Sequence, residues 1–142
     1  MVETPTQKYW GLRLQSCKAA LEKNNFDVFI AQTPREAARI VIDRILPEID
    51  VKSVSWGDSL TLYETGVLEF FKANSEFNLI QTFDKKASRQ EIIERRRKAL
   101  LTDLFFSGTN AVIESGALVN LDMVGNRVGA ITFGPDHVVI MV

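Results

Sequence analysis

DLFFSGTNAVIESGALVNLDMVGNRVGAITFGPD (Asp103–Asp136) is the stretch around which the rest of the chain is organised. It opens with the apolar run Leu104–Phe106, which breaks into the small and polar residues 107–110 (SGTN). Two runs with the composition of β-strands follow, Ala117–Leu121 and Val128–Phe133. Small and polar residues gather where the apolar runs end, as they do at the ligand-binding edge of an α/β sheet. The upstream sequence is therefore expected to supply the remaining strands and the helices that cover them.

Upstream of this stretch, helical patterns alternate with short apolar runs. Apolar residues at helical spacing, with cap residues or proline at the start, predict four helices. Their expected positions are residues 6–24, a helix that opens at Pro34, a helix capped by Asp58 or Ser59, and residues 88–101, which begin with a Ser88–Glu91 capping box. Strands are expected over residues 26–31, 51–56, 77–83 and 104–106. This alternation predicts a three-layer α/β fold, with a mostly parallel sheet and helices on both of its faces.

After Gly108 the pattern changes to strands only, over residues 117–121, 128–133 and 137–142. We therefore expect a β-rich addition at the C-terminal end of the sheet. The last run is HVVIMV, whereas a buried parallel strand normally leads into a covering helix. We expect the neighbour of this strand to lie in a segment missing after Val142 or in a second subunit, as in a homodimer. No linker or repeat marks a boundary, so residues 1–142 are expected to form one domain.

Composition and charge exclude several classes of partner. The 17 basic and 18 acidic residues give a formal net charge of −1, which offers no electrostatic attraction for nucleic acid or an anionic membrane. No apolar run approaches the roughly 20 residues that span a bilayer, and the first ten residues lack the layout of a signal peptide. The single cysteine, Cys17, allows no internal disulfide and falls on the apolar face of the first expected helix, where a core position is expected. The sequence predicts a cytoplasmic protein.

In an open α/β sheet, ligands bind outside the carboxyl ends of the strands. Four expected strand ends carry polar residues, and two of them combine glycine with a hydroxyl residue. Glycine lets backbone N–H groups approach an anion, and the hydroxyl adds a hydrogen-bond donor. The same residues also suit turns and helix caps that bind no ligand. The candidate residues for a carboxylate or phosphate site are Thr33, Gly57, Asp58, Ser59, Gly108, Thr109 and Asn110.

Glu114 is the candidate catalytic residue. It lies in the segment Val112–Gly116, where its neighbours are apolar or small. Burial there would raise the pKa of the carboxyl group, as a nucleophile or general base requires. The structural alternative is a glutamate that bonds to a nearby backbone turn, and the sequence leaves both interpretations open.

The other polar residues have structural explanations. His137 stands without the further histidines or cysteines that a metal site needs. The basic run Arg95–Lys98 has the composition of a solvated helix face, although one of its arginines could turn towards the ligand edge and bind a carboxylate. Asp122, Asn126 and Arg127 belong to an expected hairpin loop. Nucleotide-binding loops, dinucleotide-binding loops and the serine-hydrolase elbow do not occur in the sequence, and no motif identifies a cofactor.

Several short motifs nevertheless occur together in order. They are Gly57-Asp58-Ser59 with Thr61-Leu62, Ser107-Gly108-Thr109-Asn110-Ala111, Glu114-Ser115-Gly116, Gly125-Asn126-Arg127, and Gly134-Pro135 with His137. In this combination the chain resembles, from about Lys8 to Val142, the LUD domain, the lactate-utilisation domain of lactate utilisation protein C and its relatives. The resemblance implies a fold related to the sugar-phosphate isomerase and CoA-transferase group. It also implies a link to the oxidation of lactate to pyruvate, beside iron–sulfur partner subunits.

The chain departs from these relatives at its end. Many relatives continue past the last strand with a Gly-x-Asn-Lys segment and a helix, and some carry a cysteine-rich tail that could hold a cluster. Neither occurs in the 142 residues. The segment Glu114–Gly116 is, in addition, similar to the one in which class I CoA-transferases place their acyl-accepting glutamate.

Three functional hypotheses follow. The first is a LUD-type domain of lactate or related 2-hydroxy-acid metabolism that binds a small carboxylate or phosphate anion at the strand ends. The second is a CoA-transferase-type enzyme with Glu114 as the nucleophile, which requires Glu114 to face a pocket. The third is a non-catalytic subunit that docks on an iron–sulfur redox partner, which requires an exposed apolar surface.

Overall fold

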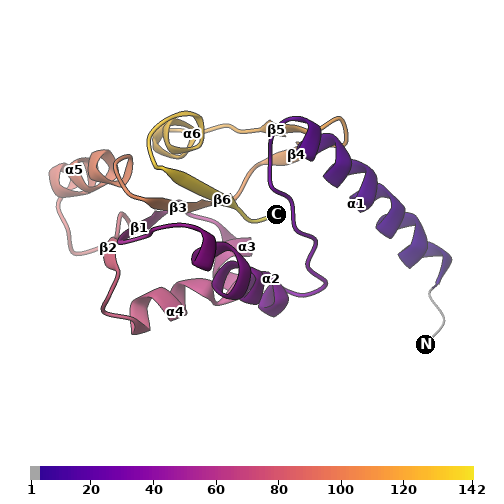
Figure 1. Cartoon of the computed structure of the whole chain (residues 1–142). Helices are drawn as coiled ribbons and strands as arrows, with labels where there is room; N and C mark the ends of the chain where they lie inside the picture. Colours follow the sequence, from indigo (N-terminus) through magenta and orange to yellow (C-terminus); the bar gives the residue numbers. More distant parts are fainter. Residues whose placement is uncertain (1–3) are drawn as a thin grey trace.

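The computed structural model describes residues 4–142 and contains a parallel sheet of four strands (Figure 1). The strand order is β2-β1-β3-β6, and all three strand pairs are parallel. The four strands are β1 (Ser53–Trp56), β2 (Asn78–Ile80), β3 (Leu104–Ser107) and β6 (His137–Ile140). The second sheet is an antiparallel hairpin of β4 (Ala111–Ile113) and β5 (Ala117–Val119).

Helices cover both faces of the parallel sheet, which confirms the expected three-layer α/β fold. The first face carries α2 (Pro34–Ile40), which continues as the π-helix η1 (Val41–Ile45) and the 3₁₀-helix η2 (Leu46–Glu48), together with α3 (Leu60–Thr65) and α4 (Val67–Ala73). The opposite face carries α5 (Arg89–Ala99) and α6 (Asn126–Thr132). In Figure 1 the two groups lie below and above the sheet. The predicted Ser88–Glu91 capping box opens α5.

The two core clusters follow from the alternation of side chains along β3. Leu104 and Phe106 point towards the first face and pack against a cluster that includes Phe71 of α4. Phe105, between them in sequence, points to the other face, where it meets Ala99 of α5 and Ala130 of α6. All of these side chains are buried. Because successive side chains of a strand point to opposite faces of the sheet, this single apolar run contributes to both core clusters.

The expected strand over residues 128–133 is wrong, because this segment forms the helix α6. Gly125, with a positive φ of 87°, turns the chain immediately before the helix. A carboxylate oxygen of Asp122 accepts the N–H of Val128 (2.8 Å), which satisfies one of the free donors of the first helical turn. Ala130 is then buried on the sheet. Packing of α6 on the sheet allows the chain to return as the parallel strand β6, so the β-rich addition consists of the β4–β5 hairpin alone.

The expected strand over residues 26–31 is also wrong. The segment is extended, but it pairs with none of the strands among residues 4–142. Without a neighbour to accept its backbone hydrogen bonds, the apolar composition alone does not make a strand.

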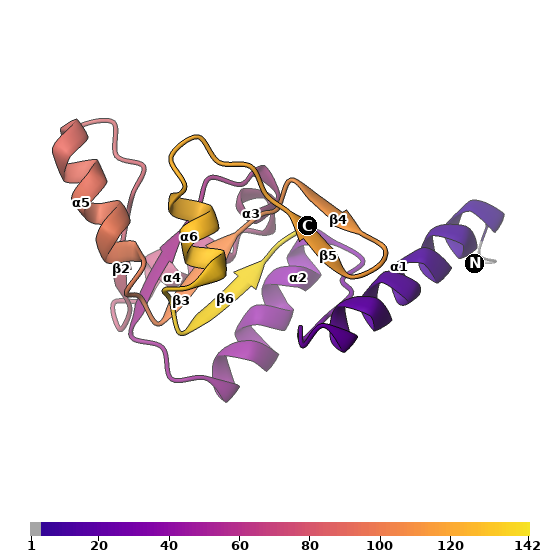
Figure 2. The same cartoon turned by 90° about the horizontal axis from the view of Figure 1, so that it is seen from above.

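The first helix, α1 (Pro5–Lys23), forms where it is expected but does not join the core. None of its residues is buried, and Cys17 is only half-buried, so its expected core position is wrong. Figure 2 shows α1 extending away from the sheet beside the β4–β5 hairpin. At the contact, a Cβ atom on Gly116 would lie 2.5 Å from the carbonyl oxygen of Ala20, so only glycine allows this approach.

None of the helices within residues 4–142 is long and apolar enough to cross a membrane.

At the amino ends of the strands, the carboxylate of Asp103 ties β1 to β3. One of its oxygens accepts the N–H of Lys52 (2.9 Å), the N–H of Ser53 (2.7 Å) and the hydroxyl of Ser53 (2.8 Å). These hydrogen bonds hold the pKa of Asp103 below its usual value, and the bond from the Lys52 N–H has the largest effect.

We expect Asp103→Asn to lower the free energy of unfolding at pH 7 by about 1.5–3 kcal/mol, because bonds to a charged acceptor become bonds to a neutral one. Because the pKa of Asp103 is lower in the folded state than in the unfolded state, its carboxylate stabilises the fold. This stabilisation is fully present above the unfolded-state pKa of about 3.9 and is lost as the pH falls through the folded-state pKa. The difference between the two proteins should therefore shrink below about pH 4. Urea unfolding from pH 7 to pH 3 measures it, with the exposed neighbour Asp50→Asn as the control. A difference that stays constant down to pH 3 contradicts the prediction.

Candidate functional site

The strand order places a topological switch point between β1 and β3. From β1 the chain crosses to β2 on one side, whereas β3 and β6 lie on the other side. Crevices at such points, outside the carboxyl ends of the strands, are the usual ligand sites of open α/β sheets. Gly57 follows β1 and Gly108 follows β3, and the N–H of Gly57 donates to the carbonyl of Phe106 (2.8 Å), which fixes the two ends side by side.

A cavity of about 330 Å³ lies at this edge. Its lining residues follow β1 and β2 or come from α5, from the chain between β3 and α6, and from the start of α6. They are Gly57, Asp58, Phe83, Arg96, Asn110, Asp122, Met123, Val124, Asn126 and Arg127. The volume lies within the range of small-molecule sites.

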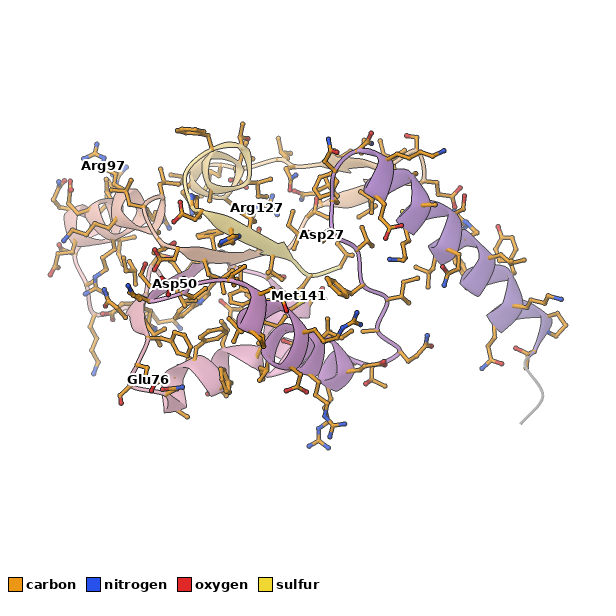
Figure 3. The ribbon with its side chains drawn as sticks, in the orientation of Figure 1. Asp27, Asp50, Glu76, Arg97, Arg127 and Met141 are labelled. Carbon is orange, nitrogen blue, oxygen red and sulfur yellow. The ribbon has the colours of Figure 1, made fainter. Side chains whose placement is uncertain are left out.

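Arg127, near the start of α6 and labelled in Figure 3, forms hydrogen bonds to several of the segments that line the cavity. Its Nε donates to Oδ1 of Asp122 (2.9 Å), and its Nη2 donates to Oδ1 of Asn110 (2.6 Å) and to the carbonyl of Leu121 (3.2 Å). The side chains of Arg127 and Asp122 are only 14% and 11% exposed. The stem of Arg127 also lies over Gly57, so one side chain links the end of β1, the segment after β3 and the start of α6.

Arg96, in contrast, brings an unpaired positive charge to the cavity. Its Nε is buried and meets no hydrogen-bond partner within residues 4–142. Arg96 also takes no part in the ion pairs of this part of the chain, whereas its neighbours Arg95 and Arg97 pair with Asp84 and Glu94. An arginine without a partner beside a cavity is suited to bind a carboxylate or a phosphate.

Asp58 supplies a negative charge on the same rim. Its side chain is exposed, and its carboxylate lies close to the phenol of Tyr63. Burial, and then the nearby charge of Asp58, raises the pKa of Tyr63, so this phenol stays protonated at neutral pH. The rim of the cavity therefore carries one cation, Arg96, and one anion, Asp58, which do not form an ion pair with each other.

The structure brings part of the sequence-derived site together. Gly57, Asp58 and Asn110 line the cavity. Gly108 and Ser59 do not line the cavity but lie against each other, since a Cβ atom on Gly108 would come within 2.6 Å of the hydroxyl of Ser59. The Ser59 hydroxyl caps α3 by accepting the N–H of Leu62 (3.2 Å).

Thr109 also has an internal role. Its hydroxyl bonds with the carbonyl of Val119 and the side chain of Asn120, both at 3.0 Å, and so closes the base of the hairpin.

Two of the expected site residues lie elsewhere. Thr33 caps α2 by accepting the N–H of Glu36 (3.1 Å) and does not line the cavity. Glu114 lies on the β4–β5 hairpin, is 54% exposed and pairs with Arg13 of α1. The expected burial of the Glu114 side chain among apolar neighbours is therefore wrong.

Four charged or amide groups of the cavity were assigned structural roles from sequence. Asp122, Asn126 and Arg127 were placed in a hairpin loop, because the segment after them was expected to be a strand. For the basic run Arg95–Lys98 the sequence favours a solvated helix face, with the alternative that one of its arginines turns towards the ligand edge, and the structure places Arg96 at the cavity. Helical spacing marks Arg96 nevertheless, since it lies four residues after Ile92 and three before Ala99, on the face that packs on the sheet.

No group of three or more potential metal ligands occurs among residues 4–142. The donors of the cavity are arginine, amide and backbone groups, which suit an anion.

We expect Arg96→Met to raise the free energy of unfolding of the unliganded protein by about 1 kcal/mol. Methionine keeps most of the aliphatic stem, while the buried and unsatisfied Nε is removed. Chemical denaturation of both proteins in buffer free of added anions measures the change. Arg97→Met on the exposed side of α5 is the matched control and should lose no more than about 0.5 kcal/mol with its surface ion pair. A loss of 1 kcal/mol or more in Arg96→Met would contradict the prediction.

Comparison with known proteins gave one match. A family model described as the LUD domain matches residues 14–142, which contain the whole sheet, the cavity and most of α1. Neither the curated proteins nor the solved structures compared with the chain gave a match.

Proposed function

Because the chain belongs to the LUD domain family, we propose that its switch-point cavity binds a small carboxylate or phosphate anion in the context of lactate utilisation. The observation that carries this proposal is the unpaired Arg96 at a cavity formed by the carboxyl ends of the strands. In this proposal the anion binds against the guanidinium group of Arg96, in the cavity that Gly57, Asn110 and Asn126 also line.

The cavity is suited to binding rather than to covalent catalysis. Its hydroxyl-bearing neighbours, Ser59 and Thr109, are engaged in a helix cap and in the hairpin base. A CoA-transferase reaction would use Glu114, which lies outside the cavity in an exposed ion pair with Arg13. The geometry therefore supports an anion-binding domain better than an enzyme with Glu114 as nucleophile.

Ligand-dependent unfolding tests the proposal. We expect lactate, pyruvate or inorganic phosphate, at about 100 times its dissociation constant, to add about 2.7 kcal/mol to the free energy of unfolding. Arg96→Met should abolish this gain, whereas Arg97→Met and Glu114→Gln should keep it. The measurement is thermal or chemical unfolding with each anion and with acetyl-CoA.

Two outcomes overturn the proposal. The first is that no anion stabilises the wild-type protein. The second is an acetyl-CoA-dependent adduct that disappears in Glu114→Gln, which would favour the transferase reaction.

A further inference from the structure

We propose that the preferred ligand of the switch-point cavity is a monocarboxylate with an apolar or aromatic body, bound through its carboxylate to Arg96 and along its body to Phe83, Met123 and Val124. The inference rests on the proposed function and narrows it. It selects a carboxylate over a phosphate and an amphipathic acid over a short polar one.

The charges of the cavity favour a single negative charge on the ligand. Two arginines and two aspartates line it. Arg127 and Asp122 neutralise each other in a largely buried pair. One free cation, Arg96, and one free anion, Asp58, remain. Any anion in the cavity meets both of these charges, but the second charge of a dianionic phosphate has no second free cation to pair with, whereas a planar monocarboxylate matches the single guanidinium fork.

Three of the residues that line the cavity are apolar, and we call Phe83, Met123 and Val124 its apolar wall. Met123 is fully exposed at 100%, Val124 is exposed and Phe83 is half-buried. Met123 and Val124 belong to the segment between β5 and α6, which Arg127 anchors through the carbonyl of Leu121. Exposed apolar residues beside a cavity gain most when a ligand with an apolar surface covers them.

The size of the cavity supports the same ligand class. Its 330 Å³ corresponds to about ten water molecules at ~30 Å³ each. A three-carbon acid held at Arg96 would leave most of this space to water. A carboxylate that carries a ring of six carbons fills more of it and reaches the apolar wall.

The test compares a carboxylate and a phosphate, each with and without an aromatic body. The four probes are propionate, 3-phenylpropionate, phenyl phosphate and inorganic phosphate, titrated by calorimetry. In the wild type, we expect 3-phenylpropionate to bind at least about 10-fold more tightly than propionate, as burial of a phenyl group provides. It should also bind more tightly than phenyl phosphate. Arg96→Met should weaken both carboxylates, and Arg97→Met should weaken neither.

A second pair of variants isolates the apolar wall. Met123→Ser with Val124→Ser should remove most of the 10-fold preference for the phenyl acid while propionate binds as before. Leu121→Ser is the matched control, because Leu121 is an exposed apolar residue of the same segment whose side chain does not line the cavity. These side chains are exposed, so the substitutions should not disturb folding.

The outcomes separate the two proposals. Binding of propionate or phosphate without a preference for the phenyl acid overturns this inference and leaves the proposed function standing. Tighter binding of phenyl phosphate than of 3-phenylpropionate overturns the choice of head group in the same way. If none of the four probes binds, this inference fails, and the proposed function is then decided by the unfolding measurements with lactate and pyruvate.

Discussion

Arg127→Met is expected to lower the free energy of unfolding by about 3–5 kcal/mol. The substitution leaves the carboxylate of Asp122 charged and only 11% exposed, without the partner that compensates for its desolvation. It also removes the donors to Asn110 and to the carbonyl of Leu121, so the segment after β5 loses its anchor on β3. Chemical denaturation measures the loss. In the same variant, anion binding at the cavity should weaken although Arg96 is intact.

A double-mutant cycle with Asp122→Asn separates the buried charge from lost packing. If the uncompensated carboxylate dominates, the double variant should be more stable than the sum of the two single losses by about 1–3 kcal/mol. Arg97→Met provides the comparison. It breaks a surface ion pair in which the arginine side chain is 70% exposed, so stability should change by no more than about 0.5 kcal/mol. A loss below 1 kcal/mol for Arg127→Met would show that solvent or a rearranged loop satisfies Asp122.

Phe71→Ala should have an effect of similar size, about 3–5 kcal/mol. Phe71 is fully buried between α4 and the sheet, and its ring lies 4.9 Å from that of Phe77, 5.3 Å from that of Phe70 and 5.4 Å from that of Phe106. Alanine leaves a cavity among three aromatic neighbours and removes the edge-to-face contacts with Phe70 and Phe77. The denaturation midpoint should fall, whereas the slope with denaturant should stay the same if the unfolding remains two-state.

Phe133→Ala is the matched control for this loss, because Phe133 is 91% exposed. Its effect should stay within about 0.5 kcal/mol. Equal losses for Phe71→Ala and Phe133→Ala would mean that α4 does not contribute to the cooperative core.

The layered fold was predictable because its signals are local. Each strand of the parallel sheet has an apolar run in the sequence, and α5 has a capping box and an apolar face. The two strands that were wrongly expected lie in segments whose structure is not determined by the local sequence pattern. The segment 26–31 has strand composition but no neighbour to pair with. The segment 128–133 is helical because Gly125 turns the chain and Asp122, six residues before Val128, accepts its N–H.

The candidate site was predictable only in part, for a related reason. Gly57, Asp58 and Asn110 lie at strand ends, where polar residues after apolar runs mark the ligand edge. Arg127 could not be assigned while the segment around it was expected to be a hairpin. The free charge of Arg96 depends on which of four adjacent basic residues faces the cavity, and this is set by the packing of α5 on the sheet rather than by composition.

The long first helix, α1, is expected to open locally while the sheet stays folded. α1 spans 19 residues without one buried side chain, and its ties to the hairpin include the Arg13–Glu114 ion pair and a 2.6 Å hydrogen bond from Asn24 to Gly116. A helix of this length is only marginally stable by itself in water. Its amide hydrogens should therefore exchange with solvent by local opening, at a far lower free energy than those of β1 and β3, which require global unfolding. A protease should therefore be able to cleave α1 while the sheet and the cavity remain folded.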